Sequence, residues 1–228
     1  ILKMIPHNYF ISSCFNFFFT KPKVTLKKKI NVNDNILQAV NTVTKSSVTL
    51  SEYNIDNISE NFYNEAKRLL PKNNYVGFSL TQGNVYRKKE WPLTSIASLC
   101  KSLKERKKIP VFFLEKKNID IKTKIKNLIP DAIFPEHDSD LACPALVACL
   151  GKRLDFAISI DNGVMHMLSL GKIPMIVLFG PTNSEKFAPN YNNILILDSK
   201  KLKNTSDISS INVQDVLKAI KQHLSFSY

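Results

Sequence analysis

From Asn74 onward the chain alternates short apolar runs with longer amphipathic segments. The apolar runs are rich in β-branched and aromatic residues and have the length of strands buried on both faces of a parallel sheet. The predicted strands are Tyr75–Leu80, Ile109–Leu114, Asp131–Phe134, Phe156–Ile160, Met175–Phe179 and Ile194–Leu197. Alternating strands and helices are typical of an α/β fold, so we expect a Rossmann-like, doubly wound parallel sheet.

The segments between these strands carry apolar residues at the spacing of amphipathic helices. The predicted helices are residues 92–103, 121–129, 141–150, 164–170 and 213–224. Pro92 suits the first position of its helix, because the N–H group that proline lacks would have no partner there. In such folds ligands bind beyond the carboxyl ends of the strands, so the loops that follow the strands hold the candidate site.

Residues 1–71 lack this alternation and do not predict a complete α/β unit. An aromatic stretch, Tyr9–Phe19, precedes the basic segment Lys21–Lys29, and helical spacing returns at residues 33–44 and 59–70. Polar residues interrupt the aromatic stretch, so we expect neither a transmembrane helix nor a signal peptide there, but a buried strand or helix.

The composition is strongly basic, with 32 Lys and Arg against 19 Asp and Glu, a net charge of +13. Such an excess attracts phosphorylated small molecules, anionic membrane surfaces or nucleic acid, although a solvated lysine-rich surface explains it equally. We expect no nucleic-acid partner, because neither aromatic–basic interleaving on a strand nor a recognition-helix pattern is present. Four cysteines without zinc-ligand spacing fit a reducing cytoplasm.

One turn concentrates the candidate chemistry. Asp161, Asn162 and Gly163 follow a predicted strand at once and precede a short apolar helix that Gly171 closes. Unpaired N–H groups and the positive end of the helix dipole favour an anion there, so the turn predicts a phosphate or diphosphate site. Gly163 has no Cβ to block the approach. A carboxylate would repel that anion, so Asp161 is expected to accept hydrogen bonds from a sugar hydroxyl or from the backbone of the turn.

The sequence DNGVMH at Asp161–His166, then LGK at Leu170–Lys172 and FGPT at Phe179–Thr182, resembles the C-terminal signature of glycosyltransferase family 9, the lipopolysaccharide heptosyltransferases. Asn162 stands where the family has Thr, and Val164 where it has Pro. The resemblance implies a two-domain GT-B fold. Residues 72–228 would form its nucleotide-sugar-binding domain, and residues 1–71 a partial N-terminal acceptor domain with the linker.

The loop Thr81–Pro92 resembles the family's glycine-containing loop that leads into Lys-x-Trp-Pro. By that resemblance Lys89 would neutralise the charge that grows on the leaving diphosphate, and Gly83 and Asn84 would lie beside it. An ordinary solvated lysine in a basic loop is the alternative for Lys89.

Two more residues are implied with alternatives beside them. His166, one turn into the short helix, would donate to a phosphate oxygen, although a histidine between two Met residues is otherwise typical of a core. Glu115 would bind the ribose hydroxyls of the nucleotide, although it also fits a plain exposed side chain beside Lys116 and Lys117. Asp138-Ser139-Asp140 spells a D-x-D pair, for which capping of the next helix is a simpler explanation than a metal.

The resemblance thus implies an inverting glycosyltransferase that needs no metal or other cofactor. It would transfer heptose or a similar sugar from a nucleotide sugar such as ADP-heptose to a lipopolysaccharide core or related glycan. We expect a cytoplasmic protein with peripheral contact to the anionic inner face of the membrane.

The family's general base is an Asp near the start of the acceptor domain, and no position here corresponds to it. The chain also begins at Ile1 and not at a methionine, which suggests a fragment or a processed chain. We therefore expect this chain alone to bind donor but to turn over poorly or not at all. The alternative is a non-catalytic protein of the same fold that binds a nucleotide or phosphorylated ligand.

Overall fold

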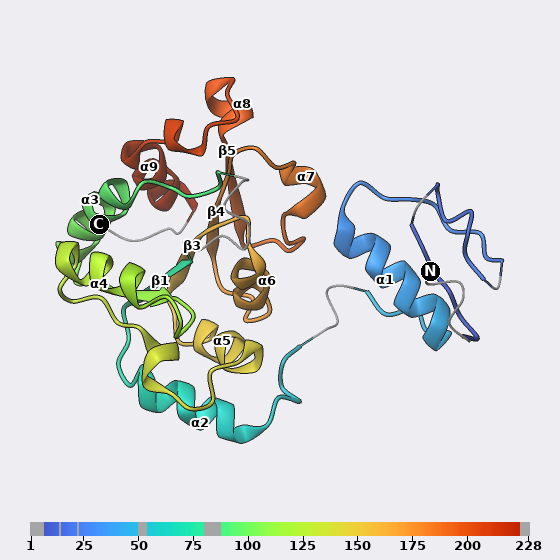
Figure 1. Ribbon diagram of the computed structural model, residues 1–228, viewed down its shortest axis with the longest axis horizontal. Helices are drawn as coiled ribbons and strands as arrows, with labels where there is room; N and C mark the ends of the chain where they lie inside the picture. Colours follow the sequence, from blue (N-terminus) through green and yellow to red (C-terminus); the bar gives the residue numbers. More distant parts are fainter. Residues whose placement is uncertain (1–6, 14, 22, 50–53, 80–87, 224–228) are drawn as a thin grey trace. The chain divides into compact units, whose positions relative to one another are not determined.

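The computed structural model describes residues 7–13, 15–21, 23–49, 54–79 and 88–223 (Figure 1). The chain divides into two compact units. The smaller unit comprises residues 1–53 and 185–190, and the larger comprises 54–184 and 191–228.

The larger unit contains one sheet of five parallel strands in the order β2-β1-β3-β4-β5. The strands are β1 (Tyr75–Ser79), β2 (Ile109–Phe113), β3 (Phe156–Ile160), β4 (Met175–Phe179) and β5 (Ile194–Asp198). Every residue of β1, β3 and β4 is buried, as the apolar runs predicted for strands covered on both faces. The predicted Rossmann-like parallel sheet is therefore confirmed.

The predicted strand at residues 131–134 is wrong. Ile133 makes a single parallel bridge with Val111, in which Phe112 N donates to Ile133 O at 2.8 Å and Ile133 N donates to Pro110 O at 3.0 Å. Pro135 then stops the pairing, because it has no N–H group to donate, and a 3-10 helix begins there.

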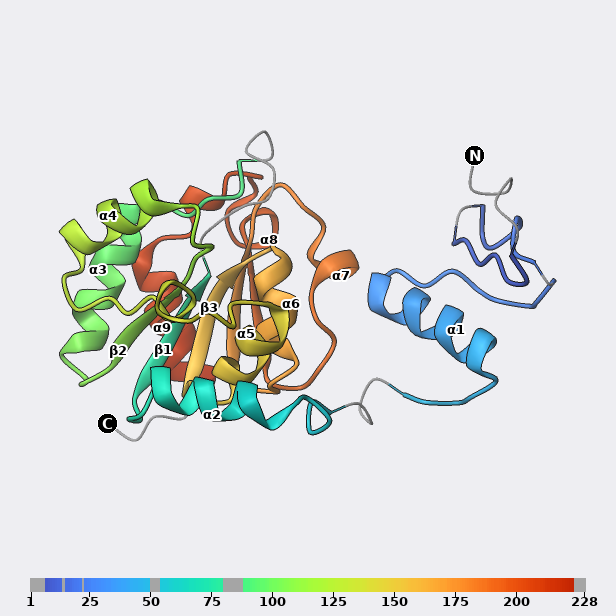
Figure 2. The same cartoon turned by 60° about the horizontal axis from the view of Figure 1, so that its bottom comes forward.

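Helices cover both faces of the sheet (Figures 1 and 2). One face packs on α3 (Leu93–Lys104), α4 (Ile119–Leu128) and α9 (Val213–His223), and the other on α5 (Pro144–Gly151) and α6 (Gly163–Ser169). Helix α2 (Glu60–Leu69) belongs to the larger unit and packs against α5. The remaining short helices of this unit are η3 (Pro135–Asp138), α8 (Ser199–Lys203) and η4 (Ile208–Ser210).

Helix α5 begins at Pro144, three residues later than predicted. The residue before a proline is disfavoured in helical backbone, and Cys143 is extended, with φ of −162° and ψ of 170°. The expected capping by Asp138 and Asp140 is therefore wrong. No side chain caps α5, and the residues of the D-x-D pair lie one turn or more before it.

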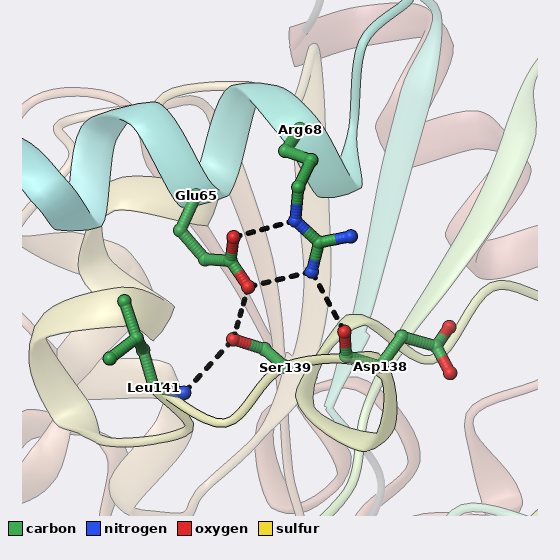
Figure 3. Close-up of polar contacts among 5 residues, drawn as sticks. All are labelled: Glu65, Arg68, Asp138, Ser139 and Leu141. Atoms are coloured by element: carbon green, nitrogen blue, oxygen red, sulfur yellow. Dashed lines mark hydrogen bonds and ion pairs between the residues drawn. The ribbon is translucent and has the colours of Figure 1, made fainter.

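Instead, that segment is bonded to α2 (Figure 3). The Arg68 guanidinium binds both carboxylate oxygens of Glu65 at 2.7 Å and donates to Asp138 O at 2.9 Å. The Ser139 hydroxyl donates to Glu65 at 2.5 Å and accepts from Leu141 N at 3.1 Å. The bonds from Arg68 and Ser139 hold the pKa of Glu65 at about 2, so this carboxylate is ionised whenever the protein is folded near neutral pH.

The smaller unit contains α1 (Val32–Thr44), which Asn31 caps by accepting from Asn33 N at 2.9 Å, and the short α7 (Ser184–Phe187) begins at the boundary between the units. In the described part of the aromatic stretch, the predicted buried strand or helix is wrong. Phe10 and Lys21 form one antiparallel bridge around a turn, and only Phe17 of the turn's phenylalanines is buried. No helix in the described residues is both long enough and apolar enough to span a bilayer.

Candidate functional site

The strand order places a topological switch between β1 and β3. From β1 the chain moves outward to β2, whereas from β3 it moves the other way to β4 and β5. Loops that leave two neighbouring strands in opposite directions open a crevice at their carboxyl ends, where open α/β sheets bind ligands. Ser79 at the end of β1 and the Asp161 turn after β3 lie at this position.

Asn162 joins the two strands at the switch. Its Nδ2 donates to Ser79 Oγ at 2.7 Å, and Ser79 Oγ donates to Asn162 Oδ1 at 3.1 Å. The same Oδ1 accepts from Met165 N at 2.9 Å and so caps α6. Asn162 was predicted as a donor-binding residue, and its side chain also fixes the shape of the turn. Ser79 was missed, because a serine at the end of an apolar run gives no signal of its own.

Gly163 is exposed, and a Cβ built on it would meet nothing within 4 Å. Its φ is not in the left-handed region. Neither backbone conformation nor packing therefore requires glycine here. What the glycine provides is open space beside the backbone of the turn, which is the property that the sequence predicted for a phosphate site.

Lys89 and Asp161 form a buried ion pair. Lys89 Nζ donates to Asp161 Oδ2 at 2.5 Å and to Asp161 O at 3.1 Å. The side chains are only 11% and 9% exposed, so each charge relies on the other for stabilisation. Lys89 was predicted to face a diphosphate and Asp161 a sugar hydroxyl or the backbone of the turn. The structure brings the two residues together and gives Asp161 a partner that the sequence did not suggest.

Trp91 anchors the loop that presents Lys89. Its ring is 3% exposed, and its indole N–H donates to Ile211 O at 2.7 Å. Helix α3 follows directly after Pro92. The predicted donor-binding residues Gly83 and Asn84 lie outside the described residues.

His166 lies half buried on α6, on the helix that begins at the turn. Burial lowers the pKa of its imidazole, and the negative charge of Asp161 offsets part of that effect. The ring is therefore neutral at pH 7, with one nitrogen able to donate and the other able to accept.

Two carboxylates near the end of β2, those of Glu115 and Glu136, differ in burial. The predicted Glu115 is exposed and pairs with Lys117 at 2.5 Å, whereas Glu136 of η3 is 9% exposed and accepts from Leu114 N–H. Burial and the charge of Glu115 raise the pKa of Glu136. Its Oε2 is buried without a hydrogen-bond partner. The burial of Glu136 was not predicted, because this residue follows Pro135 in a segment that has the pattern of a surface loop.

The D-x-D pair is spread apart. Asp138 uses its backbone carbonyl to accept from Arg68, and the Asp140 carboxylate lies 3.6 Å from Lys116 Nζ. Among the residues that the structure describes, no three His, Cys, Asp or Glu side chains are grouped as a metal site would require.

One of the comparisons with known proteins identifies a family. The family model described as glycosyltransferase family 9 (heptosyltransferase) matches residues 23–216, which is most of the chain. A search of the curated proteins found no match.

Among solved structures, the chain is similar to a glycosyl transferase family 9 protein from Veillonella parvula, with a TM-score of 0.72 and 18% identity over 91% of this chain and 65% of that one. It is also similar to the E. coli heptosyltransferase WaaC with ADP, with a TM-score of 0.64 and 14% identity over 91% of this chain and 60% of that one. E. coli ADP-heptose lps heptosyltransferase II gives a TM-score of 0.59 and 17% identity over 74% of this chain and 52% of that one. The chain thus spans less than two thirds of the length of these structures. The predicted GT-B fold is confirmed.

Proposed function

The chain belongs to glycosyltransferase family 9, and on that basis we propose that its larger unit binds a nucleotide sugar for an inverting glycosyl transfer. The donor would carry heptose or a similar sugar, and the acceptor would be a lipopolysaccharide core or related glycan. A structural neighbour that binds ADP supports a nucleoside diphosphate as the leaving group. The observation that carries the proposal is the buried Lys89–Asp161 pair at the switch between β1 and β3.

A diphosphate in the crevice would compete with Asp161 for Lys89. The diphosphate and the Asp161 carboxylate are both anions that can bind the Lys89 ammonium. A phosphate has several oxygens and makes more charge-assisted hydrogen bonds to an ammonium than one carboxylate oxygen does. Once Lys89 turns to the diphosphate, the Asp161 carboxylate would need new donors, and the hydroxyls of the donor sugar provide them. The two predicted roles and the observed ion pair are then successive states of one site.

The transfer itself would form a bond between the acceptor oxygen and the anomeric carbon while the bond from that carbon to the diphosphate breaks. The acceptor proton passes to a general base, which we do not assign to a residue of this chain. Lys89 and the amides of the turn around Gly163 would stabilise the negative charge that grows on the diphosphate. The neutral His166 would donate one further hydrogen bond to it. This chemistry needs no metal.

Calorimetric titration of the full chain with ADP, UDP and ADP-heptose tests the proposal. We expect the wild type to bind a nucleoside diphosphate and to bind ADP-heptose more tightly than ADP. Asp161→Asn removes the carboxylate charge that competes with a diphosphate for Lys89, and it leaves only a weaker, neutral amide acceptor for the sugar hydroxyls. ADP should therefore bind at least as well, while the advantage of ADP-heptose shrinks. Asp155→Asn, at the other end of β3, is the matched control and should leave that ratio unchanged. Absence of nucleotide binding in the wild type would refute the proposal.

Product analysis separates an enzyme from a binding protein. The chain is incubated with ADP-heptose and lipopolysaccharide core, and released ADP is quantified. We expect binding with little or no release, because the family's base has no counterpart in this sequence. Rapid transfer by this chain would show that a base is present within it.

A further inference from the structure

Glu136 is a buried carboxylate with one oxygen left unsatisfied. It lies on η3, where Leu114 N–H donates to one of its oxygens, while Oε2 is buried without a hydrogen-bond partner. Most buried polar side-chain atoms have a partner, because a buried acceptor without a donor costs free energy. This oxygen therefore needs a donor that the described residues around it do not supply.

Aromatic packing fixes the place of this carboxylate. Phe134, which directly precedes η3, stacks on Phe112 of β2 at a centroid distance of 5.6 Å, and Phe112 stacks on Phe78 of β1 at 5.1 Å. All three rings are buried. The core of the sheet thus holds η3 in place, so Glu136 keeps its position although its Oε2 has no donor.

The carboxyl end of β2 lies within reach of a nucleotide that is bound at the switch between β1 and β3. In the order β2-β1-β3, two strand spacings, about 10 Å, separate the end of β2 from the turn after β3. A nucleoside diphosphate whose phosphates bind at the Asp161 turn is long enough to cover that distance with its ribose and base. Ligands of open α/β sheets lie along this edge, so the nucleoside would reach the end of β2.

The two carboxylates at the end of β2 suit different parts of a nucleoside. Glu115 is exposed and pairs with Lys117, so it suits the ribose, whose hydroxyls remain in contact with water. Glu136 is buried, so it suits the base, which is flat and carries its hydrogen-bonding groups on its edge. An ionised carboxylate can only accept, and Oε2 therefore requires an N–H donor on that edge.

We propose that Glu136 selects the nucleobase of the donor, through a hydrogen bond from an exocyclic amino group to Oε2. Adenine carries such a group, whereas uracil and hypoxanthine carry a carbonyl oxygen instead. A carbonyl there would bring two acceptors together and leave the buried carboxylate unsatisfied, so the site would reject that base. Burial and the charge of Glu115 raise the pKa of Glu136, and a donor to Oε2 would lower it again because it stabilises the ionised form.

This inference rests on the proposed function and adds the identity of the base to it. The diphosphate is assigned to Lys89 and the turn after β3, whereas Glu136 is assigned to the base alone. Binding of any nucleoside diphosphate therefore tests the proposed function, and the preference between bases tests Glu136. The two results can be told apart in one set of titrations.

Calorimetric titration of the full chain with ADP and inosine diphosphate (IDP) measures the preference. The two ligands share ribose and diphosphate, so a difference in affinity comes from the base. We expect ADP to bind about tenfold more tightly than IDP, as the loss of one polar contact to a base implies. The diphosphate of purine riboside, which lacks the amino group, should also bind about tenfold more weakly than ADP.

Exchange of the carboxylate for an amide should remove the preference. In Glu136→Gln the amide oxygen can keep the bond from Leu114 N–H, and the amide nitrogen then takes the place of Oε2 as a donor. ADP binding should weaken and IDP binding should improve, so that the two affinities lie within about twofold of each other. The variant removes a buried charge that has no ionic partner, so urea unfolding should show no loss of stability.

Glu115→Gln is the matched control, because it makes the same change in the exposed carboxylate near the end of β2. It should change the affinities for ADP and IDP by the same factor, whatever its part in ribose binding, and leave their ratio unchanged.

The assignment of Glu136 is overturned if the wild type binds ADP and IDP equally, a result that leaves the proposed function standing. It is also overturned if the preference persists in folded Glu136→Gln, or if Glu115→Gln removes it, because another group then reads the base. Should Glu136→Gln not fold, equal affinity of the wild type for ADP and the diphosphate of purine riboside would be decisive against the assignment. If no nucleoside diphosphate binds, the proposed function fails and this inference fails with it.

Discussion

A Lys–Asp ion pair lies at each end of strand β3, and the two pairs differ in their surroundings. Asp155 precedes the strand and pairs with Lys108 at 2.6 Å, and Asp161 follows it and pairs with Lys89 at 2.5 Å. At the amino end Asp155 N also donates to Tyr75 O, so that pair belongs to the framework where three strands begin. At the carboxyl end the pair sits beside an open turn. An ion pair therefore indicates a site only through its place in the sheet.

The two pairs also differ in how completely they are buried. The Asp155 side chain is 29% exposed, whereas that of Asp161 is 9% exposed. Water can solvate Asp155 if its lysine is removed, but Asp161 depends on Lys89 or on a ligand. The comparison predicts that the carboxyl-end pair affects both stability and binding, and the amino-end pair affects stability alone.

The largest expected effect comes from exchanging each lysine for an apolar side chain. Lys89→Met leaves the Asp161 carboxylate buried and unpaired, which should cost about 3 kcal/mol of unfolding free energy, and it should weaken ADP binding about 100-fold. Lys108→Met should cost about 1 kcal/mol and leave ADP binding within twofold. Urea unfolding and calorimetry measure the two quantities. Equal loss of ADP affinity in both variants would break the comparison.

A pair of glycines sharpens the same contrast. A Cβ on Gly163 meets open space, so Gly163→Ala should leave stability unchanged, but the methyl group should obstruct the diphosphate and weaken ADP binding about tenfold. A Cβ on Gly77, inside β1, would lie 2.6 Å from Leu154 Cδ1, so Gly77→Ala should destabilise by about 2 kcal/mol. The folded fraction of the Gly77 variant should bind ADP normally. A stable Gly77→Ala protein would contradict the packing argument.

The Glu65–Arg68 ion pair on α2 lies nearer the surface than the two pairs of β3, and smaller effects are expected from it. The pKa of Glu65 is lowered from 4.5 to about 2, so its stabilisation is present above pH 4.5 and is lost as the pH falls toward 2. Glu65→Gln should lower the unfolding midpoint by roughly 1–3 °C at pH 7, and this difference should shrink between pH 4.5 and 3. Differential scanning calorimetry across that range checks it. A difference that is constant with pH would show that the charge of Glu65 contributes nothing.

The smallest effect concerns His166. Because burial lowers its pKa, folding favours the neutral ring, and the stabilisation is present above pH 6.5 and declines as the pH falls below it. Protonation would instead favour a bound diphosphate, so ADP affinity should rise about threefold more between pH 7 and 5.5 in the wild type than in His166→Asn. Parallel titrations of both proteins cancel the protonation of ADP itself. Identical pH profiles would remove His166 from the site.

The sheet could be predicted because a strand that is buried on both faces has a continuous run of apolar residues in the sequence. The runs at residues 156–160 and 175–179 coincide with β3 and β4, since nothing in them competes with the extended conformation. Two errors in the predicted elements of the larger unit, one strand and one helix start, are both caused by a proline. Pro135 limits the predicted strand at residues 131–134 to one bridge, because proline has no N–H group to donate. Pro144 shifts the start of the helix predicted at residues 141–150, because the residue before a proline, Cys143, disfavours helical backbone.

The candidate site was predictable only in part. The turn at Asp161–Gly163 was visible because a strand, a polar turn and a helix follow one another directly along the chain. The ion pair was not visible, because Lys89 and Asp161 are 72 residues apart and meet only through the pairing of β1 with β3. The burial of Glu136 likewise depends on how η3 folds over the end of β2. Contacts of this kind belong to the topology and leave no local pattern.

The bond between Ser79 and Asn162 has an evolutionary consequence. A half-buried amide needs an acceptor for its N–H group, and here a hydroxyl on the neighbouring strand supplies it at 2.7 Å. A threonine in place of Asn162 would have a single O–H donor that can rotate toward another acceptor, so it would depend less on position 79. Lineages that acquired asparagine at this turn should therefore have kept a small hydroxyl-bearing residue at position 79, and the two positions should have changed together.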